Sequence, residues 1–307
     1  MSPTPATLDI LVPTRDRPVR LAAMLSSLAA QRFPDDLGPA CLYLLDNGVT
    51  SAFAEFDVAR QLDVFEARGI RTVYLRRPHL DGIHAIRRHL YEASRGTVVL
   101  WLDDDVSLPA GTIEGLWGGL SNYDFTLAAS LVIDLDGLHE EEIGFGHEVR
   151  VTLHRLAEQI EHENLATVDD AWMEMTSPFG TNLMFRRETF DSTGGWRLLD
   201  PYFTSEPDRW GEDVALCVAL KSAGEAFVDI SRVVLHLTPE RRLFSGWKTS
   251  EALSELLNRN FGADHPSGLV STRRPPPAPD RRDAVAARLR AMAAHFGDTH
   301  REEPRWT

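Results

Sequence analysis

Short apolar stretches alternate with amphipathic stretches along the first third of the chain. Leucine or isoleucine recurs at helical spacing within residues 18–28 and 82–96, and we expect Asp16 to cap the first of these helices. Strands that are apolar on both faces and alternate with helices are typical of an α/β fold with a mostly parallel sheet covered by helices. The strands are predicted at residues 8–13, 41–46, 71–77 and 97–102.

The second half of the chain is less regular. Residues 135–175 form an acidic, weakly patterned insertion, and residues 271–280 are rich in proline, which predicts a linker. A helix is predicted after this linker, at residues 284–296. The other predicted elements are strands at residues 125–134 and 226–237, a strand and short helix within 180–196, and a helix at 211–224.

The composition narrows the class of protein. The 307 residues include 32 Lys and Arg against 46 Asp and Glu, a net charge of -14. Nucleic acids and anionic membranes both favour a basic surface, so neither is expected as a partner. The two cysteines lie in apolar runs, and no segment resembles a signal peptide or a membrane span. We therefore expect a soluble, cytoplasmic protein.

Polar and charged residues follow several of the predicted strands directly. In parallel sheets, ligands bind at the carboxyl ends of the strands. This shared location predicts a binding site at one edge of the sheet. The residues are Pro13, Thr14 and Arg15, then Asp46, then Arg76 and Arg77, then Asp103, Asp104 and Asp105.

Three consecutive carboxylates end the apolar stretch at residues 97–102. Alternation along an extended chain puts Asp103 and Asp105 on the same side. There they can share a divalent cation whose shell is completed by phosphate oxygens of a substrate. Asp104 would face away from such a cation. The alternative is an exposed acidic turn that binds nothing.

Two groups of motifs resemble one known family. The order LVPTRDRP, LLDNG, a basic residue before a helix, and RGTVVLWLDDD resembles the nucleotide-sugar-binding half of family 2 glycosyltransferases, which have the GT-A fold. GTNLMFRRETFDSTGGW followed by WGEDVALCVALKSAG is similar to the acceptor half. The likeness spans about residues 8–237. It implies a GT-A domain at 1–245, with halves at 1–108 and 109–245, and a C-terminal extension at 246–307.

The resemblance implies a role for each residue at the strand ends. Pro13, Thr14 and Arg15 would pass along the nucleotide, and Asp46 would accept a hydrogen bond from the base. Either Arg76 or Arg77 would lie near the base or the diphosphate. The donor site would also include Asp104, while Asp103 would bind the ribose or the metal and Asp105 the metal. The usual Asp-Asp-Gly-Ser after the second strand is replaced by LDNG, so UDP-, GDP- and dTDP-sugars all stay open as donors.

The acceptor half supplies the remaining implied residues. Asp213 would be the catalytic base, with Glu212 as the alternative, although acids in the first turn of a helix also stabilise it by ~0.3–1 kcal/mol. His236 is either a third metal ligand or an ordinary polar residue. We expect the insertion at 135–175 to form part of the acceptor site, with Trp172 as a stacking face, or else to be a surface excursion or a subunit contact. Trp196 and Trp210 are further acceptor candidates.

These residues predict a metal-dependent transferase. It would use Mn²⁺ or Mg²⁺ and move a sugar, with inversion, from a nucleoside diphosphate sugar to a small molecule, glycan or peptide. A sugar nucleotidyltransferase is one alternative, but VPTRDRP lacks the glycine-rich loop that such enzymes carry after the first strand. A non-catalytic nucleotide-sugar-binding module is another, against which the intact Asp-x-Asp and Glu-Asp motifs count. Because the insertion at 135–175 is an alternative subunit contact, the expected partners include a second copy of the chain in a homo-oligomer.

Overall fold

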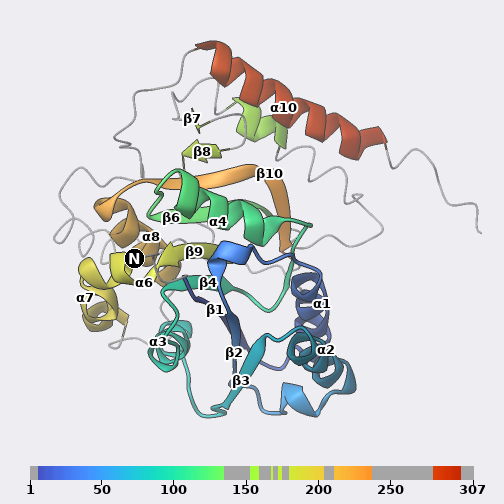
Figure 1. Cartoon of the computed structure of the whole chain (residues 1–307), viewed down its shortest axis with the longest axis vertical. Coiled ribbons are helices and arrows are strands. Elements are labelled where there is room, and N and C mark those ends of the chain that lie inside the picture. Colours follow the sequence, from blue (N-terminus) through green and yellow to red (C-terminus); the bar gives the residue numbers. More distant parts are fainter. Residues whose placement is uncertain are drawn as a thin grey trace, which may run out of the picture.

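The computed structural model describes residues 6–134, 153–158, 167–168, 172–174, 180–203, 211–236 and 279–298. Ten strands in these ranges form one sheet, whose main path runs β3-β2-β1-β4-β9-β6-β10-β8-β7, with β5 paired to β10 (Figure 1). The strands are β1 Leu8–Thr14, β2 Ala40–Asp46, β3 Arg71–Arg76, β4 Val98–Leu102, β5 Val106–Ser107, β6 Leu127–Asp134, β7 Thr167–Val168, β8 Trp172–Glu174, β9 Asn182–Arg186 and β10 Ala226–His236.

The sheet is parallel at one end and mixed at the other. β3, β2, β1 and β4 run parallel to one another, and β6 runs parallel to β10. β9 lies antiparallel between β4 and β6, and β5 and β8 are antiparallel to β10. The predicted α/β class is confirmed, and one sheet includes strands from both residues 1–108 and residues 109–245.

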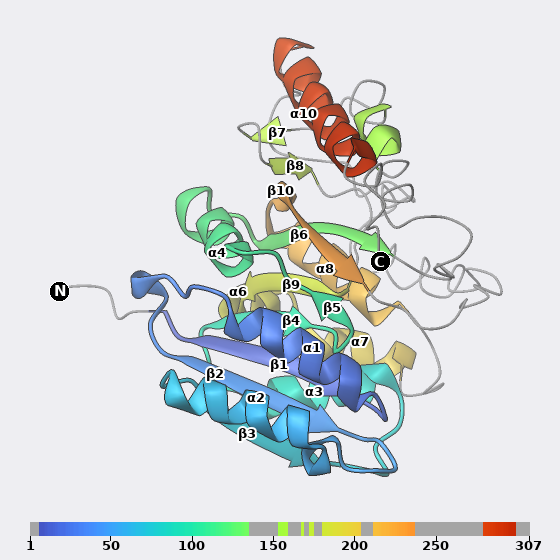
Figure 2. The same cartoon turned by 90° about the vertical axis from the view of Figure 1, so that its right-hand side faces the viewer.

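Helices cover both faces of the sheet (Figures 1 and 2). Alternate strand residues enter different layers: Ile10 packs in the layer that includes α1, α2 and α4, and Leu11 in the layer that includes α3, α7 and α8. Because both faces are covered, β1, β2 and β4 are buried throughout, whereas β3 at the end of the sheet is only partly buried. The helices are α1 Pro18–Ala29, α2 Phe56–Ala67, α3 Ile83–Ala93, α4 Thr112–Asn122, α6 Arg187–Ser192, α7 Gly195–Phe203, α8 Glu212–Ala223 and α10 Pro279–Asp298, with short 3₁₀ turns at Asp35–Leu37 and Ala52–Ala54.

Asp16 does not cap α1, so that prediction is wrong. The N-cap is Arg17, and Asp16 has a φ of 54°. Its Oδ1 accepts hydrogen bonds from the backbone nitrogens of Val49 and Thr50 at 2.7 and 3.2 Å. A Cβ at Gly48 would lie 2.6 Å from the same oxygen, so this close approach needs glycine. Asp16 therefore ties the loop after β1 to the loop after β2.

Two short strands of the insertion at 135–175 extend the sheet. β8 pairs with β10, and β7 pairs with β8. Trp172 is only 5% exposed, and its ring packs edge-on against Phe125 with the centroids 5.2 Å apart. Trp196 is buried as well, against Trp101 and Phe190. Because core side chains cover both rings, the structure does not favour Trp172 as the predicted stacking face or Trp196 as the predicted acceptor residue; Trp210 lies outside the described residues.

Replacing Trp172 with alanine should destabilise the fold. Truncating a buried tryptophan typically costs ~3–5 kcal/mol in free energy of unfolding, because both contacts and hydrophobic burial are lost. Chemical denaturation measures this loss. The matched control is Phe56→Ala, since Phe56 is 76% exposed and its loss should change stability by less than about 0.5 kcal/mol. A raised acceptor KM with unchanged stability would restore the acceptor assignment.

The predicted C-terminal helix is confirmed and starts earlier than expected. α10 begins at Pro279, inside the predicted linker, and proline suits a first helical position because its missing N–H has no helical partner there. Residues 271–278 and 246–270 lie outside the described ranges. The side chains of α10 that enter the core are Val285, Ala286, Leu289 and Ala293, in one cluster with Leu153 and Ala157 of a helical segment at 153–158.

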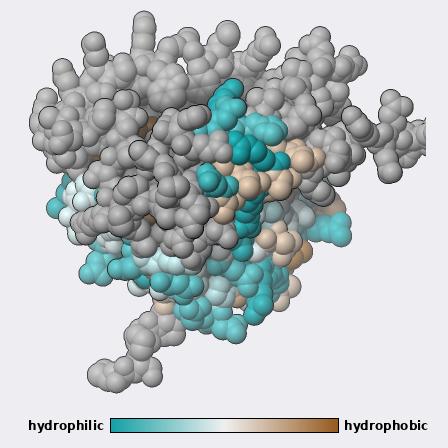
Figure 3. Space-filling view, turned by 90° about the horizontal axis from the view of Figure 1, so that it is seen from above, coloured by the Kyte–Doolittle hydropathy of each residue, from teal (hydrophilic) through white to brown (hydrophobic). Residues whose placement is uncertain are grey.

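The α10 end of the molecule is shown in space-filling form in Figure 3, where the described surface mixes hydrophilic and apolar residues. In the described ranges, the helices are all too short or too polar to cross a bilayer.

Candidate functional site

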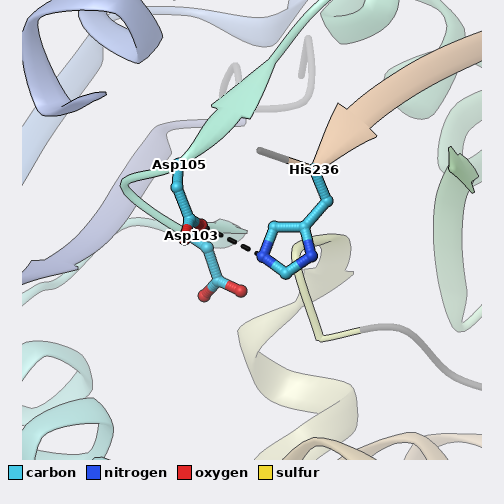
Figure 4. Close-up of side chains that lie close together, drawn as sticks. All are labelled: Asp103, Asp105 and His236. Atoms are coloured by element: carbon cyan, nitrogen blue, oxygen red, sulfur yellow. Dashed lines mark ion pairs between the residues drawn. The ribbon is translucent and has the colours of Figure 1, made fainter. Parts of the chain in front are cut away.

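Three side chains from separate strand ends meet at one edge of the sheet. Asp103 follows β4, Asp105 precedes β5, and His236 ends β10. β5 and β10 pair so that His236 lies opposite Val106, which brings its ring beside Asp105 (Figure 4). His236 Nε2 lies 3.1 Å from Asp105 Oδ1. One ligand atom from each of the three side chains lies within 4.8 Å of the other two.

This group is rich in negative charge. Burial and the neighbouring charge of Asp105 raise the pKa of Asp103, although the guanidinium of Arg87 opposes the shift. Arg87 Nη2 lies 3.0 Å from Asp103 Oδ1, and Arg17 Nη1 lies 2.8 Å from Asp105 Oδ2. Two guanidinium groups therefore stand beside five carboxylates, which belong to Asp103, Asp104, Asp105, Glu212 and Asp213. A divalent cation would offset this excess of negative charge.

The donor atoms fit such a cation. Carboxylate oxygens suit Mg²⁺ and Mn²⁺, and an imidazole nitrogen is an acceptable ligand for Mn²⁺. Asp103, Asp105 and His236 supply this combination from strand ends that the sheet holds in place.

Asp104 points elsewhere. Its Oδ2 accepts a hydrogen bond from Thr14 Oγ1 at 2.7 Å, and its Oδ1 lies 3.4 Å from Arg17 Nη1. The residue is 5% exposed. Asp104 thus stabilises the loop after β1. Because its oxygens face Thr14 and Arg17, the geometry does not favour its predicted contact with the nucleotide-sugar donor. Burial, followed by the repulsion from Asp105, raises its pKa to about 7.

Asp104→Asn should change how stability depends on pH. A carboxyl whose pKa is raised on folding holds its proton in the native state between its unfolded and folded pKa values, so the native state loses stability as pH rises through that window. The variant lacks this loss and keeps an oxygen for Thr14. Its stability relative to the wild type should therefore improve by up to roughly 1.4 kcal/mol per pH unit between about 4 and 7.

Denaturation of both proteins in EDTA, at several pH values across this window, measures the difference. A difference that is flat with pH would show that Asp104 is ionised throughout.

Both carboxylate oxygens of Asp46 accept hydrogen bonds from the following loop and from β3. It is fully buried, and its Oδ1 accepts from the Gly48 nitrogen at 2.9 Å while Oδ2 accepts from the Ala52 nitrogen at 2.8 Å. The Tyr74 hydroxyl and Arg76 Nη1 add to these donors. Four donors occupy both oxygens, so the geometry does not favour the prediction that Asp46 accepts a hydrogen bond from a base. Its evident role is to shape the loop after β2.

The other residues predicted to bind the nucleotide sugar differ in exposure. Pro13 and Thr14 lie in buried β1. Arg76 is held by Asp46 and by the Val49 carbonyl oxygen at 2.9 Å. The exposed pair differs in its contacts: Arg15 forms an ion pair with Asp81 at 3.0 Å, and Arg77 Nη1 donates to the Arg76 carbonyl oxygen at 2.9 Å.

The two acids at the start of α8 lie in different environments. Glu212 is 4% exposed, and its Oε1 lies 3.1 Å from Arg87 Nη1. Burial raises the pKa of Glu212 to about 7, although the guanidinium of Arg87 opposes the shift. Asp213 is partly exposed; its Oδ2 accepts from the Gly180 nitrogen at 3.2 Å and its Oδ1 from the Val214 nitrogen at 2.8 Å. Of the two, Asp213 is the more exposed acid.

Arg87 is a site residue that the sequence reasoning missed. It lies on α3 between Ile83, Ile86 and Leu90, the residues that define the apolar face of that helix. A charged residue on such a face needs a buried partner. An arginine within the apolar face of α3 was therefore the feature of the sequence that could have identified Arg87. The residues that follow the strands do not identify it.

Comparison with known proteins places this architecture among transferases. Residues 9–194 match the family model described as Glycosyl transferase family 2. Curated protein sequences gave no significant match. Many solved structures are similar to this chain, and several of them hold nucleotides or nucleotide sugars.

A mannosyltransferase, PcManGT from Pyrobaculum calidifontis, in complex with GDP-Man and Mn²⁺, has a TM-score of 0.53 and 15% identity, covering 96% of this chain and 75% of that one. GalNAc-T7 with UDP, GalNAc and Mn²⁺ has a TM-score of 0.56 and 15% identity, covering 83% and 47%. S. aureus TarS 1-349 in complex with UDP-GlcNAc has a TM-score of 0.52 and 12% identity, covering 96% and 73%. At these identities the likeness concerns the fold.

Proposed function

This chain belongs to glycosyl transferase family 2, and we propose that it moves a sugar, with inversion, from a nucleoside diphosphate sugar to a soluble acceptor, using Mn²⁺ or Mg²⁺. It is a glycosyltransferase with the GT-A fold, as the sequence predicted. The alternatives of a sugar nucleotidyltransferase and of a non-catalytic module are therefore set aside.

One observation carries the proposal. Asp103, Asp105 and His236 offer ligand atoms within 4.8 Å of one another, and Asp213 is connected to Asp103 by hydrogen bonds through Gly180 and Arg87. A cation-binding group and a partly exposed carboxylate thus share one end of the sheet. Transfer from a nucleoside diphosphate needs both, because charge grows on the leaving diphosphate while the acceptor loses a proton.

The chain's own residues would take the acceptor proton and hold the cation. The acceptor oxygen forms a bond to the anomeric carbon from the side opposite the diphosphate. The bond from that carbon to the diphosphate oxygen breaks, and its electron pair leaves with the diphosphate. Asp213 takes the acceptor proton, while Asp103, Asp105 and His236 would hold the cation. A bound Mn²⁺ or Mg²⁺ stabilises the negative charge that develops on the diphosphate.

The donor is proposed at the level of its class. The similar structures include complexes with GDP-Man, with UDP and with UDP-GlcNAc, and two of them hold Mn²⁺. Asp46 is occupied by its own loop, so discrimination between bases is expected to depend on other groups at the ends of β1 to β3. The acceptor is proposed to be a small molecule, a glycan or a peptide.

A panel of UDP, GDP and dTDP with and without Mn²⁺ tests the donor site by thermal shift. A ligand at about 100 times its Kd stabilises the native state by ~2.7 kcal/mol, which gives a readily measured rise in Tm. The matching UDP-, GDP- and dTDP-sugars then test turnover through release of the nucleoside diphosphate. The configuration of the product, determined by NMR, tests inversion. Stabilisation that does not depend on the metal, or a product with retained configuration, would refute the proposal in that respect.

A further inference from the structure

Arg87 joins several parts of the site from a buried position on α3. Its Nη2 donates to Asp103 Oδ1 at 3.0 Å and to the Gly180 carbonyl oxygen at 3.4 Å. Its Nη1 lies 3.1 Å from Glu212 Oε1. The guanidinium carbon lies 4.7 Å from the ring centroid of Trp101, on the neighbouring strand β4. One side chain therefore contacts residues that follow β4, precede β9 and begin α8.

Gly180 extends this network to Asp213. Its nitrogen donates to Asp213 Oδ2 at 3.2 Å, while its carbonyl oxygen accepts from Arg87. A Cβ at Gly180 would lie 2.6 Å from Asp213 Cβ and 3.1 Å from Arg87 Nη1. The three residues are thus packed too closely for a larger side chain at 180. Arg87 is connected to Asp213 in two ways. Gly180 is hydrogen-bonded to both residues, and Glu212, which pairs with Arg87, precedes Asp213 in α8.

We propose that Arg87 is a positioning residue, which holds the start of α8, and with it Asp213, in place relative to Asp103. This inference rests on the proposed function, because it assigns Asp213 to the proton and Asp103 to the cation. Arg87 is 5% exposed, which leaves little surface for a substrate. Its planar fork contacts three partners at once, and a lysine ammonium cannot reproduce that geometry.

Three variants separate positioning from simple neutralisation of charge. Arg87→Lys keeps the charge and loses the fork, and Arg87→Met keeps most of the stem and loses both. Arg88→Lys is the matched control, since Arg88 is the next residue and pairs with Glu92 and Asp200 outside the site. The Mn²⁺ dissociation constant is measured from the paramagnetic resonance signal of free Mn²⁺. Turnover is measured as hydrolysis of the nucleotide sugar that the wild type cleaves.

The expected result is a fall in kcat without a loss of metal. Arg87→Met should lower kcat by more than about 100-fold and Arg87→Lys by at least about tenfold, because the base is displaced. Arg87→Met should not weaken Mn²⁺ binding, since removing a cation beside Asp103 does not disfavour another cation there. Arg87→Lys leaves the charge beside Asp103 unchanged, so its Mn²⁺ dissociation constant should stay close to that of the wild type. Arg88→Lys should stay within about twofold of the wild type. Arg87→Lys with wild-type kcat, or folded Arg87→Met that no longer binds Mn²⁺, would overturn the proposal.

A double-mutant cycle tests whether Arg87 acts through Glu212. Glu212→Gln removes one of the carboxylates that Arg87 holds. If the two residues act as one unit, the combined loss in kcat is much smaller than the product of the single losses. Losses that multiply would show that Arg87 acts independently of α8, against the proposal.

Amide hydrogen exchange at Gly180 gives a measurement that needs no turnover. The Gly180 N–H is bonded to Asp213, so its protection reports the placement of that carboxylate. Arg87→Met should speed this exchange by more than about tenfold, while the amides of β4 keep their protection. Unchanged exchange at Gly180 would contradict the inference. Wild-type protein that binds neither Mn²⁺ nor a donor would instead contradict the proposed function.

Discussion

Asp213→Asn is expected to lower kcat by ~10²–10⁴-fold, because the amide keeps the shape of the side chain and cannot take the acceptor proton. Asparagine keeps an oxygen for the Gly180 nitrogen, so the fold and the binding of donor and Mn²⁺ should persist. Steady-state kinetics with the donor gives kcat, and thermal shift with the nucleoside diphosphate gives binding. A fall in kcat with unchanged binding is typical of an interaction made only in the transition state.

Two further variants show whether the loss of kcat is specific to Asp213. Asp191→Asn is a matched control on α6, where Asp191 accepts a hydrogen bond from the Tyr91 hydroxyl at 2.7 Å, and its kcat should stay within about twofold of the wild type. Glu212→Gln should cost less than Asp213→Asn, because Glu212 is buried against Arg87. Should Glu212→Gln be inactive and Asp213→Asn remain within a few-fold of the wild type, the base is Glu212.

Asp105→Ala should remove metal binding. Asp105 contributes an oxygen to the three-residue group and lies beside His236, so its loss leaves two ligands on separate strand ends. Loss of even an outer-shell partner of a metal ligand typically costs 10–100-fold in affinity, and loss of a ligand should cost more than about 100-fold. The Mn²⁺-dependent rise in Tm with a nucleoside diphosphate should disappear at the same time.

Asp104→Asn supplies the control for this experiment. Asp104 is the adjacent carboxylate and bonds to Thr14, so its replacement should leave the Mn²⁺ dissociation constant within about threefold of the wild type. Mn²⁺ binding that survives in Asp105→Ala and fails in Asp104→Asn would reverse the assignment of the two carboxylates. Unchanged nucleotide affinity in Asp105→Ala with Mn²⁺ present would show that this group does not bind the metal.

The sequence by itself determined the elements of the donor half and the edge where the polar residues gather. β1, β2 and β4 occur where continuous apolar runs predicted them, because a strand covered on both faces is recognisable from its own residues. β3 also occurs where it was predicted, although it mixes polar and apolar residues and is only partly buried. The period of two along an extended chain also separated Asp104 from Asp103 and Asp105 before any contact was known.

Only the tertiary structure decided what each polar or aromatic side chain contacts. His236 joins Asp105 through the pairing of β5 with β10, which links residues far apart in the chain. Asp46 is occupied by donors from the following loop and from β3, and Trp172 is buried because β8 extends the sheet. Arg87 reaches both Asp103 and Glu212 only when α3 and α8 lie on the same face. Local pattern sets secondary structure, whereas the partners of a side chain depend on which distant segments the sheet brings together.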